Sequence, residues 1–140
     1  MKFTLFTTTA ALTLLSTYAA AVQLQYDPAY DNAGESLINA ACSDGPNGLM
    51  TRGFTTFGSL PNFPHIGAAD VITGWNSPNC GTCWQVTYNG KSINILAMDV
   101  AGNGFNVAQQ AMDELTNGQA VALGNIDVQS VQVDASVCGL

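Results

Sequence analysis

Four cysteines constrain this chain more than any other feature of its sequence. Cys80 and Cys83 form a close pair in the second half of the chain, and Cys42 and Cys138 stand far away on either side. Four cysteines allow three disulfide pairings. If each member of the close pair bonds a distant partner, both halves of the chain are tied to its centre, and each bond contributes about 2–4 kcal/mol. The spacing alone does not choose between Cys42–Cys80 with Cys83–Cys138 and the crossed arrangement.

The Cys80–Cys83 spacing is also that of a thioredoxin-like redox site. This interpretation is weaker, because two further cysteines offer partners and no strand–helix–strand pattern surrounds the pair. His65 is the single histidine, so the three or four ligands of a zinc site cannot be assembled. We therefore expect no metal and no cofactor.

Residues 1–21 have the features of a secretory signal peptide. Lys2 supplies a positive charge, residues 3–15 are largely apolar, and residues 19–21 are all alanine. Cleavage after Ala21 leaves residues 22–140 as one mature domain in a compartment where disulfides form. The apolar run is shorter than the roughly 20 residues that a membrane-spanning helix needs, so we expect no membrane span.

The charge balance restricts the partners. The chain carries a formal net charge of −7 at pH 7, and only 9% of its residues are charged. Nucleic acids and anionic membranes recruit proteins through Lys and Arg, which makes them poor partners here. A chain with few charges and abundant Gly, Asn, Ser and Thr is better suited to a neutral, hydroxyl-rich ligand.

Two stretches of the mature chain have clear β patterns. Residues 22–26 alternate apolar and polar side chains, as in a half-buried strand. Asn89 and Gly90 separate two β-rich runs, 84–88 and 92–98, which indicates a hairpin with a type I′ turn.

One helix is predicted after residue 106. Asn106 is a good N-cap with Gln109 as its capping-box partner, and Gly118 suits the left-handed C-terminal position. The apolar face at helical spacing consists of Val107, Ala111, Met112 and Leu115.

The other segments are less regular. Residues 42–64 are rich in turn formers and predict long loops, and residues 68–72 suit one helical turn or a short strand. Ile126 and Val128 share one parity while Val131 and Val133 share the other, which indicates a β-bulge in the last strand. Several strands, one helix and long loops together predict a mainly β barrel.

An eleven-residue segment closely resembles the cerato-platanin family of secreted fungal proteins, namely Gly74-Trp75-Asn76-Ser77-Pro78-Asn79-Cys80-Gly81-Thr82-Cys83-Trp84. Shorter matches extend the resemblance over the mature chain: Tyr26-Asp27, Cys42-Ser43-Asp44-Gly45, Asn47-Gly48-Leu49, Thr51-Arg52, Phe63-Pro64, Gly104-Phe105-Asn106, Gly118-Gln119-Ala120, Gln132-Val133-Asp134 and Cys138-Gly139-Leu140. One departure is visible, since the family often has Tyr-Gly-Trp after Thr-Arg and this chain has Gly53-Phe54.

The resemblance implies a six-stranded double-psi β-barrel with one or two short helices over residues 22–140, related to expansins. It also implies the pairings Cys42–Cys80 and Cys83–Cys138. Family members are non-catalytic as a rule, bind N-acetylglucosamine oligomers in a shallow groove, and elicit plant defence. We therefore expect a monomeric protein of the fungal wall or medium, with chitin oligosaccharides and a plant surface receptor as partners.

Asp99 is the centre of the expected groove. It resembles the acidic residue that expansins and endoglucanases place there. Glycan hydrolysis usually needs two facing carboxyl groups. The early acids lie in no motif resembling the second catalytic position, which favours binding over cleavage: Asp27, Asp31, Glu35 and Asp44.

Six residues form the expected carbohydrate-binding set: Asp99, Arg52, Thr51, Asn106, Asp44 and Tyr26. Arg52 is expected to pair with Asp99, and its planar donors suit acetamido and hydroxyl oxygens. The two acids of this set also have a structural interpretation: Asp99 could cap the turn at 101–104, and Asp44 could form a turn. Trp75 and Trp84 could stack on sugars, although core packing is the better interpretation for Trp84.

Two other functions fit parts of the sequence. One is expansin-like loosening of polysaccharides or weak glycan hydrolysis, which differ in whether reducing ends are released. The other is a surface-active coat protein, which would assemble at an interface whether or not sugar is present.

Overall fold

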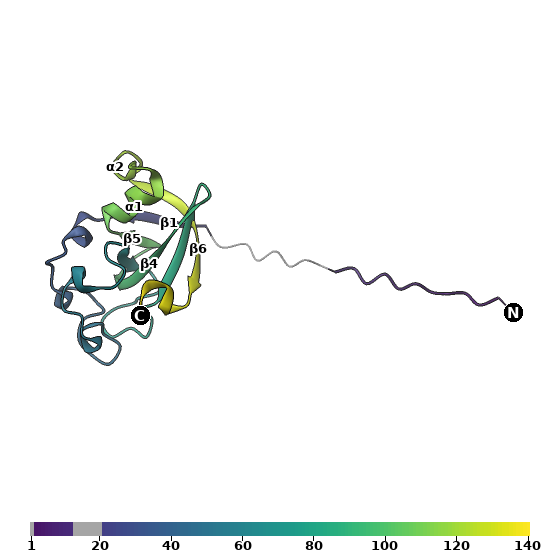
Figure 1. The fold of residues 1–140 in the computed structure, drawn as a ribbon, viewed down its shortest axis with the longest axis horizontal. Coiled ribbons are helices and arrows are strands. Elements are labelled where there is room, and N and C mark those ends of the chain that lie inside the picture. The colour runs from purple at the N-terminus through teal and green to yellow at the C-terminus, as the bar shows by residue number, and fades with distance from the viewer. Residues whose placement is uncertain (1, 13–20) are drawn as a thin grey trace.

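The computed structural model describes residues 2–12 and 21–140. Residues 2–12 have no regular secondary structure and extend away from the domain (Figure 1). Residues 1 and 13–20 of the predicted signal peptide lie outside the described residues, and Ala21 is the first residue of β1, so cleavage after Ala21 stays a prediction. No helix of the described part is long and apolar enough to cross a membrane.

Six strands close into a barrel with the neighbour order β1-β5-β2-β4-β3-β6 (Figure 1). The β1–β5 and β2–β4 pairs are parallel and the other four are antiparallel. The predicted six-stranded, mainly β barrel is therefore confirmed. The strands are β1 (Ala21–Tyr26), β2 (Ile66–Ala69), β3 (Cys83–Tyr88), β4 (Lys91–Val100), β5 (Phe105–Val107) and β6 (Asn125–Val133).

The β3–β4 hairpin forms where the sequence predicted it. Asn89 and Gly90 join the two strands with φ angles of 45° and 81°. Both angles are positive, as a type I′ turn requires. The ladder runs from Tyr88 opposite Lys91 to Cys83 opposite Leu96 without a register shift.

The predicted bulge in the last strand is wrong. β6 pairs with both β1 and β3 in continuous register. Val131 takes the outer face and is 49% exposed, so no extra residue is needed to bury it. The barrel instead has its register shift between Gly67 and Ala68, where β2 runs beside β4.

The predicted helix is present as α1 (Gln109–Thr116), followed by a short α2 (Ala120–Leu123). Ala111, Met112 and Leu115 are buried, as the spacing predicted. At the C-terminal end Gly118 has a φ of 83°, one residue beyond the left-handed Asn117. The predicted apolar face of the helix is therefore confirmed at these three positions, whereas Val107, its fourth predicted member, belongs to β5.

The predicted N-cap of α1 is wrong. Asn106 lies within β5, and the N-cap residue Ala108 offers no side-chain bond. The two carboxylate oxygens of Asp31 accept hydrogen bonds from the N–H groups of Gln109 and Gln110 at 2.8 and 2.9 Å. The helix start is thus capped by a residue far away in the chain, which a local pattern cannot reveal.

The segment before β2 forms loops with short 3₁₀ turns, as expected for residues 42–64. The 3₁₀ turns of the domain are η1 (Pro28–Asp31), η2 (Leu37–Asn39), η3 (Met50–Arg52), η4 (Phe57–Ser59) and η5 (Ala135–Cys138). Leu37, Leu49 and Phe57 are buried in the core cluster, so these loops carry apolar anchors. Of the uncertain residues 68–72, Ala68 and Ala69 end strand β2.

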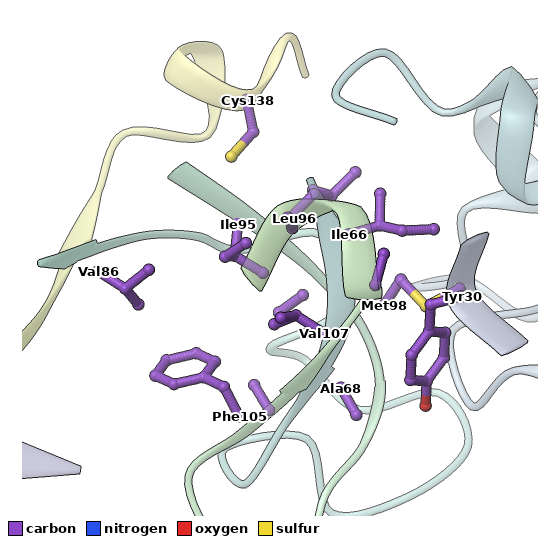
Figure 2. Close-up of a cluster of buried hydrophobic side chains, with 14 of the residues drawn as sticks. Tyr30, Ile66, Ala68, Val86, Ile95, Leu96, Met98, Phe105, Val107 and Cys138 are labelled. Atoms are coloured by element: carbon purple, nitrogen blue, oxygen red, sulfur yellow. The ribbon is translucent and has the colours of Figure 1, made fainter. Parts of the chain in front are cut away.

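The core combines the barrel interior with the loops that cover it. Figure 2 shows Val86, Ile95, Phe105 and Val107 from β3, β4 and β5 within one buried cluster. The two disulfides have the predicted pairing, Cys42–Cys80 with Cα atoms 5.4 Å apart and Cys83–Cys138 with Cα atoms 5.7 Å apart. The first ties the loops to the segment before β3, and the second ties the C-terminus to β3.

We predict that Asp31→Ala lowers the free energy of unfolding by about 1–2 kcal/mol, because it removes the cap of α1. Urea unfolding followed by circular dichroism measures this loss. Asp127→Ala is the matched control, since Asp127 is exposed on β6 and makes no side-chain hydrogen bond within the described residues. An equal loss in the two variants would contradict the capping role.

Candidate functional site

Asp99 and Asn106, two residues of the predicted set, lie on either side of Ala68. Ala68 pairs with Asp99 across β2–β4 and with Asn106 across β2–β5. Directly paired residues place their side chains on the same face of a sheet. Asn106 stands between Phe105 and Val107, which face the barrel interior in Figure 2, so its own side chain faces outward. The fold thus brings these two predicted residues together on the outer face.

The same row continues across two more strands. Gln25 of β1 pairs with Asn106, and Asn125 of β6 pairs with Gln25. At about 4.8 Å per strand, the five positions span roughly 19 Å. We call this set the amide row: Asn125, Gln25, Asn106, Ala68 and Asp99. Gln25 and Asn125 are exposed, whereas Asn106 and Asp99 are half-buried.

Amide groups dominate the exposed end of this row. The Gln23 side-chain oxygen accepts hydrogen bonds from Asn103 at 3.2 Å and from Asn125 at 3.5 Å. The Oδ1 atom of Asn106 is buried and has no hydrogen-bond partner within the described residues. A buried acceptor of this kind is ordinarily satisfied by protein, water or ligand.

Asp99 is held by three neutral donors. Its Oδ2 accepts from the Tyr30 hydroxyl at 2.9 Å, and its Oδ1 accepts from the N–H groups of Ala41 and Val100, each at 2.9 Å. The turn that Asp99 was expected to cap is closed by Asp70 instead, which accepts from the Gly104 N–H at 2.9 Å.

The predicted Arg52–Asp99 ion pair is wrong. Over residues 2–12 and 21–140 the single ion pair joins His65 and Glu114. Arg52 is exposed at the end of η3. Both oxygens of Asp99 instead accept hydrogen bonds from the neutral donors of Tyr30, Ala41 and Val100.

Tyr30 is a site residue that the sequence analysis missed. It lies in η1, its side chain is buried, and its hydroxyl donates to Asp99. Burial, and next the neighbouring Asp99 carboxylate, raise the pKa of Tyr30 far above its ordinary value. The phenol therefore stays protonated and remains a donor. Only an aromatic residue inside a turn was visible in the sequence, and nothing in its spacing pointed to Asp99.

The remaining predicted residues lie outside the amide row. Tyr26 is half-buried at the end of β1 and packs against the core. Thr51 donates its hydroxyl to the Gly48 carbonyl at 2.6 Å, which stabilises a turn. Asp44 is exposed and accepts from the indole N–H of Trp75 at 2.8 Å. Their expected contacts with sugar stay predictions.

Trp84 has the structural role that the sequence favoured. It is half-buried, its ring centroid lies 5.9 Å from that of Phe105, and its indole N–H donates to Thr82 at 2.9 Å.

The acids that precede the barrel's second strand are engaged in local structure. Asp27 accepts from the Ala29 N–H at 2.9 Å, and Asp31 caps α1. Glu35 accepts from the side chains of Asn32 and Asn39. In the described part of the chain, no three His, Cys, Asp or Glu side chains are grouped so that they could hold a metal ion.

Known proteins of one family are similar to this chain in sequence and architecture. The family model described as Cerato-platanin matches residues 22–140, and the chain belongs to the cerato-platanin family. The heat-stable 19 kDa antigen of Coccidioides immitis is 46% identical over 145 residues, covering 100% of this chain and 99% of the relative.

Solved structures agree. The crystal structure of cerato-platanin 3 from M. perniciosa is 63% identical with a TM-score of 0.83, covering 86% of this chain and 100% of that one. The solution structure of the fungal elicitor cerato-platanin is 45% identical with a TM-score of 0.75, covering 84% of this chain and 96% of that one. The two disulfides are consistent with an extracellular location.

We predict that stability falls on the alkaline side because of Tyr30. Above the ordinary pKa of about 10, an unfolded tyrosine loses its proton while folded Tyr30 keeps it. The unfolded state then binds fewer protons, so the free energy of unfolding falls with rising pH, by up to about 1.4 kcal/mol per pH unit.

Urea unfolding at several pH values measures this slope. The range from about pH 8 to pH 11 brackets the ordinary tyrosine pKa. Tyr30→Phe should flatten the slope, whereas Tyr88→Phe should leave it as in the wild type. The hydroxyl of Tyr88 has no hydrogen-bond partner within the described residues. Equal slopes for wild type and Tyr30→Phe would show that Tyr30 is not the titrating group.

Proposed function

We propose that this protein is a secreted, non-catalytic carbohydrate-binding protein that recognises N-acetylglucosamine oligomers along the amide row. The observation that carries the proposal is the row itself. It places Asn125, Gln25, Asn106 and Asp99 on one outer face, with the buried Ala68 of β2 between Asn106 and Asp99.

The chemistry of the row suits a neutral sugar chain. Side-chain amides offer both donors and acceptors, which match the hydroxyl and acetamido groups of N-acetylglucosamine. The strand spacing of about 4.8 Å is close to the length of one pyranose unit, so successive units can meet successive strands. The unpartnered Oδ1 of Asn106 would accept from an acetamido N–H or from a bound water.

The hydrogen bonds of Asp99 support binding rather than cleavage. A glycosidase usually needs one protonated carboxyl group and a second carboxylate across the bond. Both oxygens of Asp99 are instead engaged by three donors of the protein itself. Of the early acids, Asp27 caps a turn and Asp31 caps α1, while Glu35 accepts from neighbouring side-chain amides and Asp44 from Trp75.

The place of action is proposed from the family. One relative with a solved structure is titled a fungal elicitor, so we propose that this chain acts in the fungal wall or medium and elicits plant defence. A plant surface receptor is then a further partner. The second candidate function is expansin-like loosening of polysaccharides without hydrolysis. Asp99 resembles the acidic residue of expansins and has no identified second catalytic carboxylate.

The test is a titration of the ¹⁵N-labelled protein with chito-oligosaccharides. We expect saturable chemical-shift changes at Gln25, Asn106 and Asp99. The absence of any shift at millimolar sugar would refute chitin-oligomer binding. Release of reducing ends from a glycan, lost on replacement of Asp99, would refute the non-catalytic role.

A paired variant locates the site. We predict that Gln25→Ala with Asn125→Ala weakens binding by about fivefold to a hundredfold, because two exposed hydrogen-bonding side chains are lost at about 0.5–1.5 kcal/mol each. Gln132→Ala is the control, since Gln132 is exposed on β6 but pairs with Trp84, away from the row. Isothermal titration calorimetry measures the affinities, and equal affinity in all three proteins would exclude the amide row as the site.

A further inference from the structure

Trp75 is a large aromatic side chain that the packing of the domain leaves exposed to solvent. It is 62% exposed, whereas the other tryptophan, Trp84, is half-buried against Phe105. Single exposed apolar residues are common on protein surfaces, so the exposure of Trp75 matters only together with how its ring is held.

The indole is nevertheless fixed in place. Its Nε1–H donates to Oδ1 of Asp44 at 2.8 Å, and this hydrogen bond lowers the pKa of Asp44. A Cβ atom on Gly45 would lie 2.9 Å from Cζ2 of Trp75, so the ring rests closely against the glycine backbone. Gly45 has a φ of 88°, which also favours glycine there.

The two loops that carry these residues are clamped together. The Asn47 N–H donates to Oδ1 of Asn76 at 2.8 Å, and the Asn47 side chain donates to the Asn76 carbonyl at 3.0 Å. The Cys42–Cys80 disulfide joins the same two loops. A ring held in this way loses little conformational entropy when a ligand covers it.

We propose that Trp75 and Asp44 form a stacking subsite for one pyranose ring of the sugar chain that the amide row binds. The proposal rests on the proposed function for the identity of the ligand. The apolar C–H face of a pyranose packs on an aromatic ring, while its hydroxyl groups point outward at the rim. Oδ2 of Asp44 has no hydrogen-bond partner within the described residues and is placed to accept from such a hydroxyl.

The subsite is connected to the amide row by a short stretch of backbone. Ala41 donates its N–H to Asp99, and Asp44 follows only three residues later. Three residues reach at most about 11 Å. A sugar chain that contacts Asp99 therefore needs only a few more units to reach Trp75.

The experiment follows both indole N–H resonances by NMR while a tetramer of N-acetylglucosamine is titrated into the protein. The Trp75 resonance should shift saturably and the Trp84 resonance should not. Trp75→Ala should weaken binding at least about tenfold, as for a buried aromatic contact in an interface. Val121→Ala, another exposed apolar residue at 65%, should leave binding unchanged. Thermal unfolding checks that both variants fold.

The outcomes separate this proposal from the one on which it rests. Binding at the amide row with an unmoved Trp75 resonance and unchanged affinity in Trp75→Ala would overturn the subsite alone. No shift anywhere in the protein would overturn both. A Trp75 shift that depends on protein concentration without sugar would overturn the subsite in favour of self-association.

Discussion

The carboxylate of Asp99 joins the N-terminal loops of this protein to its barrel. It accepts from Tyr30 and Ala41, which precede it by 69 and 58 residues, and from the N–H of Val100. Each donor is neutral, so the charge is satisfied without burying a second ion. Cys42 follows Ala41 directly, and its disulfide fixes the same loop covalently. Polar and covalent restraints therefore meet at one place.

The candidate site depends on this junction. The half-buried Asp99 is the last position of the amide row. It is also the position at which the N-terminal loops contact the sheet. Beyond it, the loop that starts at Ala41 carries Asp44 toward Trp75. The row stands on strands and the indole stands on clamped loops, so both surfaces are preorganised. The loop between Ala41 and Asp44 is the short covalent link between these two places.

Local sequence signals predicted the elements that depend on local physics. Asn89-Gly90 gave the hairpin because both positions need positive φ, and the spacing of Ala111, Met112 and Leu115 gave the buried face of α1. The resemblance supplied the disulfide pairing, which the spacing had left open. Juxtaposition of Asp99 with Asn106 follows only once the strand order of the barrel is known.

The wrong predictions of the α1 cap and of the Arg52–Asp99 pair share one physical cause. In both, the hydrogen-bond partner comes from a residue far away in the chain. Asp31 caps α1 across 78 residues, and main-chain N–H groups replace the arginine expected beside Asp99. Such partners leave no periodic trace in the sequence. Arg52 was expected beside Asp99, but its residue type does not report where its side chain points. Tyr30 became recognisable only through the contact that its hydroxyl makes.

The pairing of β1 with β6 has a consequence for biogenesis. The first strand of the domain forms its antiparallel ladder with the last, Val22 opposite Val128 and Gln25 opposite Asn125. The barrel therefore cannot close until residues near 128 have been synthesised, and its closure must wait for contacts of long sequence separation. A chain that lacks β6 leaves one edge of β1 and one edge of β3 without a pairing partner. The topology thus makes closure of the barrel wait for the last strand of the domain.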